Sequence, residues 1–280
     1  MLKKRIITGA LLIIGLIGIV WLDMSLASSS GTLAKGAILA LFCAAVVVPL
    51  LAAETCQLAS KAGRFANYPV VLVCSILMLL AMWLQDGDSM NRPLAILALS
   101  LLLAFIACTR DRSPQGVIAS VSTTLFAIVY SGVLLGFWLM LRSSHDGWVI
   151  LGAILTVKMG DIGAFATGCS IGRTPLIPWL SPKKTWEGLL GGIIAASVLG
   201  GLLALASQSL PEGDRYPVMT GVLFGAVAAV IGLLGDLIGS AMKRDAGAKD
   251  SGSMLPGLGG VIDILDSLLL VGPVAWWMLR

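Results

Sequence analysis

Long apolar runs, separated by short polar stretches, dominate this chain. A run of about 20 apolar residues spans the hydrocarbon core of a bilayer as a helix, whereas a membrane β-strand would alternate apolar and polar residues. Only helices and closed barrels satisfy the backbone inside lipid. The pattern therefore predicts an all-α polytopic integral membrane protein with about nine transmembrane helices, at approximately 6–22, 34–53, 68–85, 93–108, 115–141, 147–169, 188–207, 217–241 and 260–279.

The composition agrees with this fold class and excludes an aqueous globular domain. Hydrophobic residues fill 58% of the 280 positions and charged residues only 12%, against about 25% charged in an average soluble domain. The mean hydropathy is +0.96. Residues 1–21 resemble a signal peptide, but no small-residue cleavage site with a soluble domain follows them, so we expect a retained first span.

The distribution of lysine and arginine predicts the orientation of the helices. These residues gather in the segments on the same side as the N-terminus, so the positive-inside rule predicts a cytoplasmic N-terminus and an outside C-terminus. The net charge of +4 reflects this bias and anionic lipid headgroups rather than nucleic acid, because no separate basic domain exists. We expect a bacterial plasma (inner) membrane, with the active site facing the cytoplasm.

The chemistry-bearing residues are concentrated in the second half of the chain. We expect N-terminal transmembrane helices over 1–145, and over 146–280 a catalytic transmembrane region with cytoplasmic loops 170–187 and 242–259. The five cysteines lack metal-type spacing, and the single histidine, His145, argues against histidine catalysis and a His-rich zinc site.

Small residues recur every four positions in the runs 188–207 and 217–241. Such faces let membrane helices approach closely, so these glycines and alanines predict tight helix packing rather than chemistry. The same faces would permit a homodimer.

Four aspartates lie within or at the ends of predicted spans: Asp161, Asp236, Asp263 and Asp266. A carboxylate near the middle of a span costs about 2.5–3.5 kcal/mol, so such acids are paired, hydrated or bound to cations. Asp263 and Asp266 share a helix face, and Asp236 lies near the inner end of the preceding helix. Clustered carboxylates repel one another unless a proton or hard cation intervenes, and oxygen ligands suit Mg²⁺.

The loop 242–259 supplies cations beside these acids, namely Lys243, Arg244 and Lys249. Acids for a metal, cations for phosphate and a glycine-rich turn together suggest phosphoryl or nucleotidyl transfer. The alternative is a cytoplasmic cationic loop that is simply ion-paired to nearby acids. The glycines that would let the backbone approach a ligand are Gly252, Gly257, Gly259 and Gly260.

A second charged segment, SPKKTWEG at 181–188, begins with a serine and a proline, which predicts a helix start there. Lys183 and Lys184 near a helix N-terminus would attract phosphate. Trp186 is a candidate to stack on a base, although an interfacial tryptophan is more often a membrane anchor. Glu187 is a candidate to take a proton, hydrogen-bond a hydroxyl or pair with a lysine.

These segments closely resemble the C-terminal signature of the phosphatidate cytidylyltransferases, also called CDP-diacylglycerol synthases. The resemblance covers roughly residues 155 to 270, and its motifs are long and without gaps. It is carried by Gly235-Asp236, Ser240, Lys243-Arg244, Lys249-Asp250-Ser251-Gly252, Pro256-Gly257, Gly259-Gly260, Asp263 and Asp266-Ser267, with SPKKTWEG, Asp161, Gly163 and Gly172 upstream.

The resemblance implies Mg²⁺-dependent transfer of CMP from CTP to phosphatidate, which gives CDP-diacylglycerol and pyrophosphate. It implies that Asp236 and Asp263 bind the metal, with Asp266 as a third participant and a second, monovalent cation such as K⁺. The remaining roles that it implies are phosphate neutralisation by Lys243, Arg244, Lys249, Lys183 and Lys184, orientation of Lys249 or metal binding by Asp250, contact with metal or substrate by Ser240, and a place near the site for Asp161.

Two positions depart from the family pattern. The family has a histidine within P-G-H-G-G and an arginine directly after the first paired acid, where this chain has Leu258 and Ile264. Lys158, unusual within a span, is a candidate partner of Asp161 or of a substrate phosphate, and it would restore the charge that Ile264 does not provide.

These departures leave open two alternative functions, a CTP-dependent transferase for another lipid phosphate or a non-catalytic phosphatidate-binding paralogue. A secondary transporter is disfavoured because the two halves of the chain show no convincing repeat.

Overall fold

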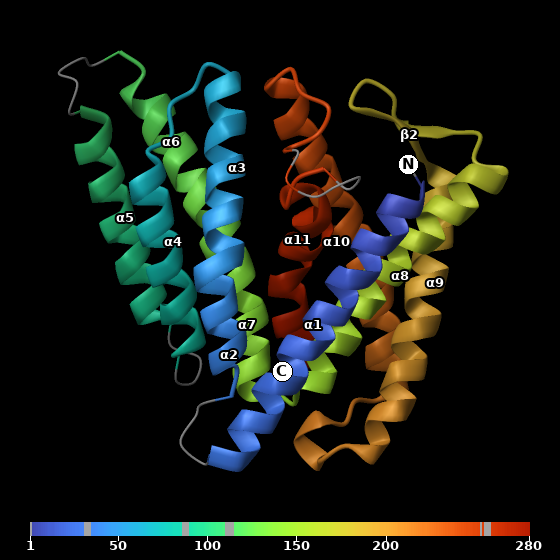
Figure 1. Cartoon of the computed structure of the whole chain (residues 1–280). Coiled ribbons are helices and arrows are strands. Elements are labelled where there is room, and N and C mark those ends of the chain that lie inside the picture. Colours follow the sequence, from blue (N-terminus) through green and yellow to red (C-terminus); the bar gives the residue numbers. More distant parts are fainter. Residues whose placement is uncertain (1, 31–34, 86–89, 110–114, 253, 255–258) are drawn as a thin grey trace. The chain divides into compact units, whose positions relative to one another are not determined.

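The computed structural model describes residues 2–30, 35–85, 90–109, 115–252, 254 and 259–280. Helices dominate these residues, and two helices are continued by π-helical turns (Figure 1). The helices are α1 (Leu2–Ser30), α2 (Ala37–Phe42), the π turn η1 (Cys43–Val47), α3 (Val48–Lys61), α4 (Tyr68–Trp83), α5 (Asn91–Thr109), α6 (Val117–Ile128), the π turn η2 (Val129–Val133), α7 (Leu134–Ser144), α8 (Gly147–Ile171), α9 (Trp186–Ala206), the short 3₁₀ turns η3 (Ser207–Ser209) and η4 (Glu212–Asp214), α10 (Val218–Asp245) and α11 (Ile262–Leu279).

The fold class predicted from hydropathy is confirmed: the protein is an all-α polytopic membrane protein. The third predicted run, 68–85, forms the 16-residue helix α4, which at 1.5 Å per residue reaches only about 24 Å. Among the described residues, eight helical stretches are long and apolar enough to cross a membrane: Thr8–Ser28, Ala37–Lys61, Asn91–Thr109, Val117–Ser144, Gly147–Ile171, Trp186–Ser209, Glu212–Asp245 and Ile262–Leu279.

Packing divides the chain into two compact units. The first comprises Met1–Met140 with Met242–Ile264, and the second comprises Leu141–Ala241 with Leu265–Arg280. Because these units are defined by packing alone, the functional division into 1–145 and 146–280 stays a prediction.

In the first unit, α3, α4 and α6 pack against one another, and α5 packs against α4 and α6. The π turn η2 places the Ser131 hydroxyl 2.8 Å from that of Ser75, deep in the unit. A buried hydroxyl pair of this kind satisfies two polar groups that would otherwise be unpaired in an apolar core. One apolar cluster of this unit consists of Ala52, Val71, Cys74, Ala127 and Ile128.

In the second unit, the small-residue faces pack as the sequence predicted. A Cβ atom added to Gly200 would clash with the backbone of Gly221, and one added to Gly225 would clash with Ala196. The backbones of α9 and α10 therefore touch, which only glycine permits. α8 and α9 lie side by side along their length (Figure 1).

The helix start predicted at residue 181 is wrong. Ser181–Thr185 is the strand β2, which pairs antiparallel with β1 (Pro175–Ile177), and α9 begins only at Trp186. Thr185 is the N-cap, since its hydroxyl accepts a hydrogen bond of 3.1 Å from the Gly188 amide. The physical reason is that pairing with β1 keeps the chain extended beyond Pro182 as far as Thr185, whose side chain supplies the cap instead.

Candidate active site

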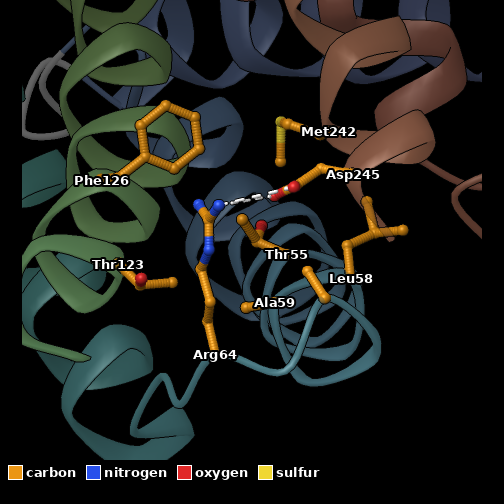
Figure 2. Close-up of a pocket in the computed structure, with 9 residues that line it drawn as sticks. Thr55, Leu58, Ala59, Arg64, Thr123, Phe126, Met242 and Asp245 are labelled. Carbon is orange, nitrogen blue, oxygen red and sulfur yellow. Dashed lines mark hydrogen bonds and ion pairs between the residues drawn. The ribbon is translucent and has the colours of Figure 1, made fainter. Parts of the chain in front are cut away.

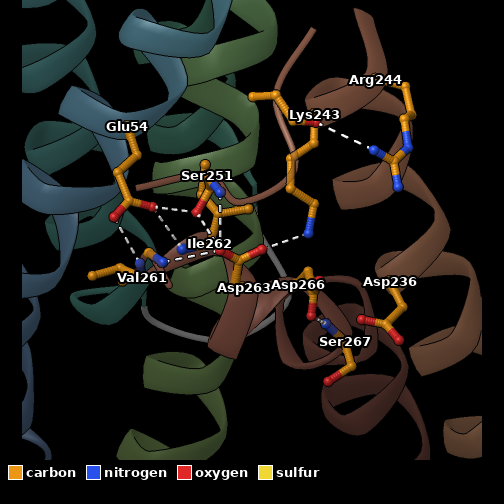
Figure 3. Close-up of polar contacts among 12 residues, drawn as sticks. Glu54, Asp236, Lys243, Arg244, Ser251, Val261, Ile262, Asp263, Asp266 and Ser267 are labelled. Atoms are coloured by element: carbon orange, nitrogen blue, oxygen red, sulfur yellow. Dashed lines mark hydrogen bonds and ion pairs between the residues drawn. The ribbon is translucent and has the colours of Figure 1, made fainter. Parts of the chain in front are cut away.

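Asp263, in the first turn of α11, is the centre of a polar network in the first unit. Its Oδ2 accepts hydrogen bonds from the Ser251 amide at 2.9 Å, the Gly260 amide at 2.9 Å and the Ser251 hydroxyl at 3.0 Å. Its Oδ1 forms an ion pair of 2.5 Å with Lys243 Nζ, and the two side chains are 12% and 14% exposed (Figure 3). The two amides and Lys243 therefore fix the orientation of this carboxylate, and the Ser251 hydroxyl is a further donor within reach.

Two glycines with positive φ shape the loop that brings Lys243 and Asp263 together. Gly247 (φ 61°) ends α10, where the Ala248 amide bonds back to the Lys243 carbonyl. Gly259 (φ 90°) precedes α11, and a Cβ there would lie 2.5 Å from Asp263 Oδ2. Both positions need glycine, the second for its conformation and for space.

Glu54 joins the same network and is not among the site residues predicted from the sequence. It lies in α3, is 4% exposed, and accepts hydrogen bonds from the Val261 amide at 2.7 Å, the Ile262 amide at 2.9 Å and the Ser251 hydroxyl at 2.9 Å (Figure 3). The available signal was a lone carboxylate in an apolar helix. The predicted run stopped at residue 53, one residue too early, whereas α3 continues to Lys61.

The other charged residues predicted in this loop are exposed to solvent, namely Arg244, Lys249 and Asp250. The Arg244 guanidinium donates a long hydrogen bond of 3.5 Å to the Ala248 carbonyl. Ile264, which replaces the family's arginine, is half-buried in the first turn of α11. The motif residues Pro256, Gly257 and Leu258 lie outside the described residues.

A second acid cluster lies in the second unit, where the carboxyl groups of Asp236 and Asp266 lie close to each other (Figure 3). Lys184 Nζ lies 2.8 Å from Asp236 Oδ2, and the Ser267 amide donates to Asp266 Oδ1 at 2.7 Å. The helices α10 and α11 meet closely here, because a Cβ on Gly235 would clash with the Asp266 carbonyl. The structure thus brings Asp236 and Asp266 together, whereas Asp263 belongs to the first unit and pairs with Lys243.

Lys158 and Asp161 form an ion pair on successive turns of α8, with Nζ 3.1 Å from Oδ2. Ser267 completes the group: its hydroxyl accepts from Lys158 Nζ at 2.9 Å and donates to Asp161 Oδ2 at 3.0 Å. The predicted pairing of Lys158 with Asp161 is confirmed. Ser267 was part of the recognised motif but was not predicted to bridge them.

The β1–β2 hairpin carries the remaining predicted residues of the second unit. Glu187 accepts hydrogen bonds from the Thr174 amide at 3.2 Å and from its hydroxyl at 2.9 Å, which ties the base of the hairpin to α9. Lys183 is exposed and Trp186 is 54% exposed. Ser240, in α10, is half-buried. Of the two hairpin lysines, Lys184 is the one that contacts the acids.

The whole chain matches a known family. A model of the cytidylyltransferase family aligns with residues 3–280. The chain belongs to the cytidylyltransferase family. It is 33% identical over 245 residues to a chloroplastic phosphatidate cytidylyltransferase of Arabidopsis thaliana, covering 78% of this chain and 57% of that protein.

Bacterial relatives are similar at the same level. The chain is 35% identical over 169 residues to the phosphatidate cytidylyltransferase of Mycobacterium bovis, covering 60% of this chain and 53% of that protein. It is 34% identical over 196 residues to that of Bacillus subtilis, covering 69% of this chain and 70% of that protein. The chain thus spans only about half the length of the Arabidopsis and Mycobacterium relatives that it matches.

The resemblance to this family implies Mg²⁺, and the Asp236–Asp266 pair fits such an ion. Two carboxylates in contact repel each other unless a proton or a cation lies between them. Among the described residues, no group of three or more His, Cys, Asp or Glu side chains is placed to hold a metal ion. Mg²⁺ is commonly held by one or two carboxylates together with waters and substrate phosphates, so a pair suffices.

A small pocket in the first unit is too small to enclose a nucleotide. Its volume is about 70 Å³, far below the roughly 300 Å³ of a typical ligand pocket (Figure 2). Arg64 and Asp245 border it with an exposed ion pair of 3.2 Å. The lining residues are Thr55, Leu58, Ala59, Ala62, Arg64, Thr123, Phe126, Met242 and Asp245.

Proposed function

We propose that this cytidylyltransferase transfers CMP from CTP to phosphatidate and so makes CDP-diacylglycerol and pyrophosphate for phospholipid biosynthesis. The observation that carries the proposal is the pairing of acids with lysines on α11 and around it. Asp263 pairs with Lys243 in the first unit, and Asp236, in contact with Asp266, pairs with Lys184 in the second. Acids for a cation beside lysines for phosphate are what nucleotidyl transfer needs.

The reaction is an in-line displacement at the α-phosphorus of CTP. An oxygen of the phosphatidate phosphate forms the new bond to this phosphorus, while the bond to the β-phosphate oxygen breaks and its electrons leave with pyrophosphate. A phosphate monoester is largely ionised near neutrality, so the attacking oxygen needs no general base. The protein therefore contributes position and charge rather than a covalent intermediate.

The lysines and the arginine that lie beside these acids would neutralise phosphate. Lys243 and Lys184 are now held by aspartates, so a triphosphate with its cation would exchange these partners. Arg244 and Lys249, both exposed, and Lys183 on the hairpin are free to meet CTP from the aqueous side. Ser240 would contact the metal or the substrate, and Asp250 would orient Lys249 or help to bind the metal. Trp186 would stack on the cytosine. The residues proposed to contact substrate phosphates or hydroxyls are Asp161, Lys158 and Glu187.

The metal proposed is Mg²⁺, with a second, monovalent cation such as K⁺. Asp236 and Asp266 would hold Mg²⁺ in the second unit, and Asp263 is proposed to bind a cation beside Lys243 in the first. When bound, Mg²⁺ supplies charge that lowers the repulsion between the two phosphates and stabilises the departing pyrophosphate. Omitting Mg²⁺ should stop transfer, and its return should restore it.

The proposed location is the inner face of a bacterial plasma membrane, with a cytoplasmic N-terminus and an outside C-terminus. Phosphatidate keeps its acyl chains in the leaflet, whereas CTP arrives from the cytosol, so a site at the inner interface serves both. A homodimer is compatible with the small-residue helix faces.

A substrate panel tests this function. Purified protein in detergent micelles with Mg²⁺ would receive CTP labelled in its α-phosphate, together with phosphatidate or a polyprenyl phosphate. With labelled CTP and phosphatidate, label should appear in the lipid. With ATP labelled in the same position instead of CTP, it should not. Transfer to the polyprenyl phosphate alone would favour another lipid substrate. Folded protein that binds phosphatidate without transfer would indicate a non-catalytic paralogue, in line with Leu258 and Ile264.

A further inference from the structure

Glu54 is a buried carboxylate that the proposed chemistry does not use. It lies within the membrane-spanning stretch Ala37–Lys61 and is 4% exposed. Its two oxygens accept the amides of Val261 and Ile262, which belong to the start of α11. The first amides of a helix have no hydrogen-bond partner within the helix. A carboxylate placed there accepts from them and is also stabilised by the positive end of the helix dipole. Glu54 therefore fixes the end of α11 that carries Asp263.

One hydroxyl links Glu54 directly to Asp263. Ser251 Oγ lies 2.9 Å from Glu54 Oε2 and 3.0 Å from Asp263 Oδ2. A serine hydroxyl has a single hydrogen, so it donates to only one of the two carboxylates at a time. The hydrogen bonding of Asp263 is thereby coupled to Glu54.

Two motif glycines are shaped around this carboxylate. A Cβ on Gly252 would lie 2.8 Å from Glu54 Oε1, and one on Gly260 would clash with both Glu54 oxygens. Real Cβ atoms essentially never approach other atoms closer than 3.0 Å. The loop before α11 thus folds against Glu54, a residue about 200 positions earlier in the chain.

We propose that Glu54 is a positioning residue for CMP transfer: through Ser251 and the first turn of α11 it holds the Asp263 carboxylate in its working orientation. This inference rests on the proposed function. The alternative is that Glu54 only caps the start of α11 and does not affect the reaction. Another buried acid of the chain, Asp23, provides a matched control for such a structural role. Asp23 is also buried, at 1% exposed, and accepts the amides of Gly36 and Ile38.

A double-mutant cycle separates the two roles. Glu54→Gln keeps the shape of the side chain and removes its charge, and it should lower kcat about 10- to 100-fold, as loss of a supporting contact beside a metal ligand does. Ser251→Ala should also lower kcat. The kcat of the double variant should be at most about threefold below that of the less active single variant. Both substitutions break the same connection between Glu54 and Asp263, so their effects should not multiply. The control Asp23→Asn should stay within about threefold of wild type.

Hydrogen exchange provides a readout that needs no activity. In Glu54→Gln the amides of residues 260–263 should exchange at least about tenfold faster, because two of them lose a charged acceptor. In Asp23→Asn they should be unchanged. If Glu54→Gln does not fold, Glu54→Asp replaces it, since it keeps the charge but withdraws the carboxylate by one methylene; it should lose kcat and amide protection in part.

Several results would overturn the role of Glu54. These are a kcat near that of wild type in Glu54→Gln, an equal loss in Asp23→Asn, or effects of Glu54→Gln and Ser251→Ala that multiply. Unchanged exchange of 260–263 would refute the positioning itself. A wild-type protein that transfers no CMP would instead overturn the proposed function and with it any catalytic role of Glu54, while the exchange experiment would still decide whether Glu54 holds the loop.

Discussion

Replacing Lys243 by methionine should destabilise the protein more than replacing Lys243 and Asp263 together. The two side chains are only 14% and 12% exposed, and their charged atoms lie 2.5 Å apart. Removing one partner of a buried ion pair leaves a charge without compensation and costs about 3–5 kcal/mol. Asp263 keeps its bonds to Ser251 and Gly260, so we expect the lower end, about 3 kcal/mol. In the double variant Lys243→Met/Asp263→Asn neither buried charge remains, so its free energy of unfolding should fall by only about 1–2 kcal/mol.

Thermal unfolding followed with a thiol-reactive dye measures this order. Cys43 and Cys74 are buried and react only when the protein unfolds, while exposed Cys169 and half-buried Cys56 and Cys108 are replaced by serine to remove background. The expected order of Tm is wild type, then the double variant, then Lys243→Met. Arg64→Met is the matched control: its ion pair with Asp245 is about half exposed, so its loss should cost less than about 1 kcal/mol.

The same variants separate stability from activity. Both Lys243→Met and the double variant should lose CMP transfer, although the double variant is the more stable of the two. The reasoning is refuted if the double variant unfolds at or below the Tm of Lys243→Met, since the ion pair would then not compensate a buried charge. Retained transfer in the double variant would remove both residues from the site.

Three further changes test the second unit. Lys158→Met should abolish CMP transfer while stability stays within about 1 kcal/mol, because the ion pair is one-third exposed; near-normal turnover would exclude a role in catalysis. Gly235→Ala should lower unfolding free energy by about 1–3 kcal/mol, whereas Gly213→Ala, with open space around it, should change it by less than about 0.5 kcal/mol; equal Tm values would contradict the close packing. Glu187→Ala should speed hydrogen exchange of the Thr174 amide about fivefold, and unchanged exchange would show that the carboxylate does not hold the hairpin.

Hydropathy predicted the membrane helices well, because burial in lipid demands long apolar runs wherever the helices cross. It was less informative about their ends. The run at 68–85 yields a helix of only 16 residues, and the run at 34–53 continues to Lys61. Helix ends depend on local caps and on π turns such as Cys43–Val47, which leave no mark in mean hydropathy. The hairpin before α9 escaped prediction because a serine before proline is extended both as a helix cap and as part of a strand, so Ser181 and Pro182 fit either structure.

The candidate site was predicted in its residue types and only partly in its contacts. Charged residues within apolar helices identified Asp236, Asp266 and the Lys158–Asp161 pair, since intramembrane charges need partners. Glu54 was missed because its partners, Ser251 and the amides of α11, lie far along the chain and only folding brings them together. Contacts of that kind depend on tertiary packing, which a single sequence does not encode in any local pattern.

The most direct test of the account is CMP transfer from α-labelled CTP to phosphatidate in detergent micelles with Mg²⁺, measured for wild type and Asp263→Asn side by side. We predict label in lipid, with release of one pyrophosphate per CMP transferred, for wild type alone. Asp263→Asn at wild-type rates would contradict the site, and folded wild-type protein that transfers nothing would contradict the function.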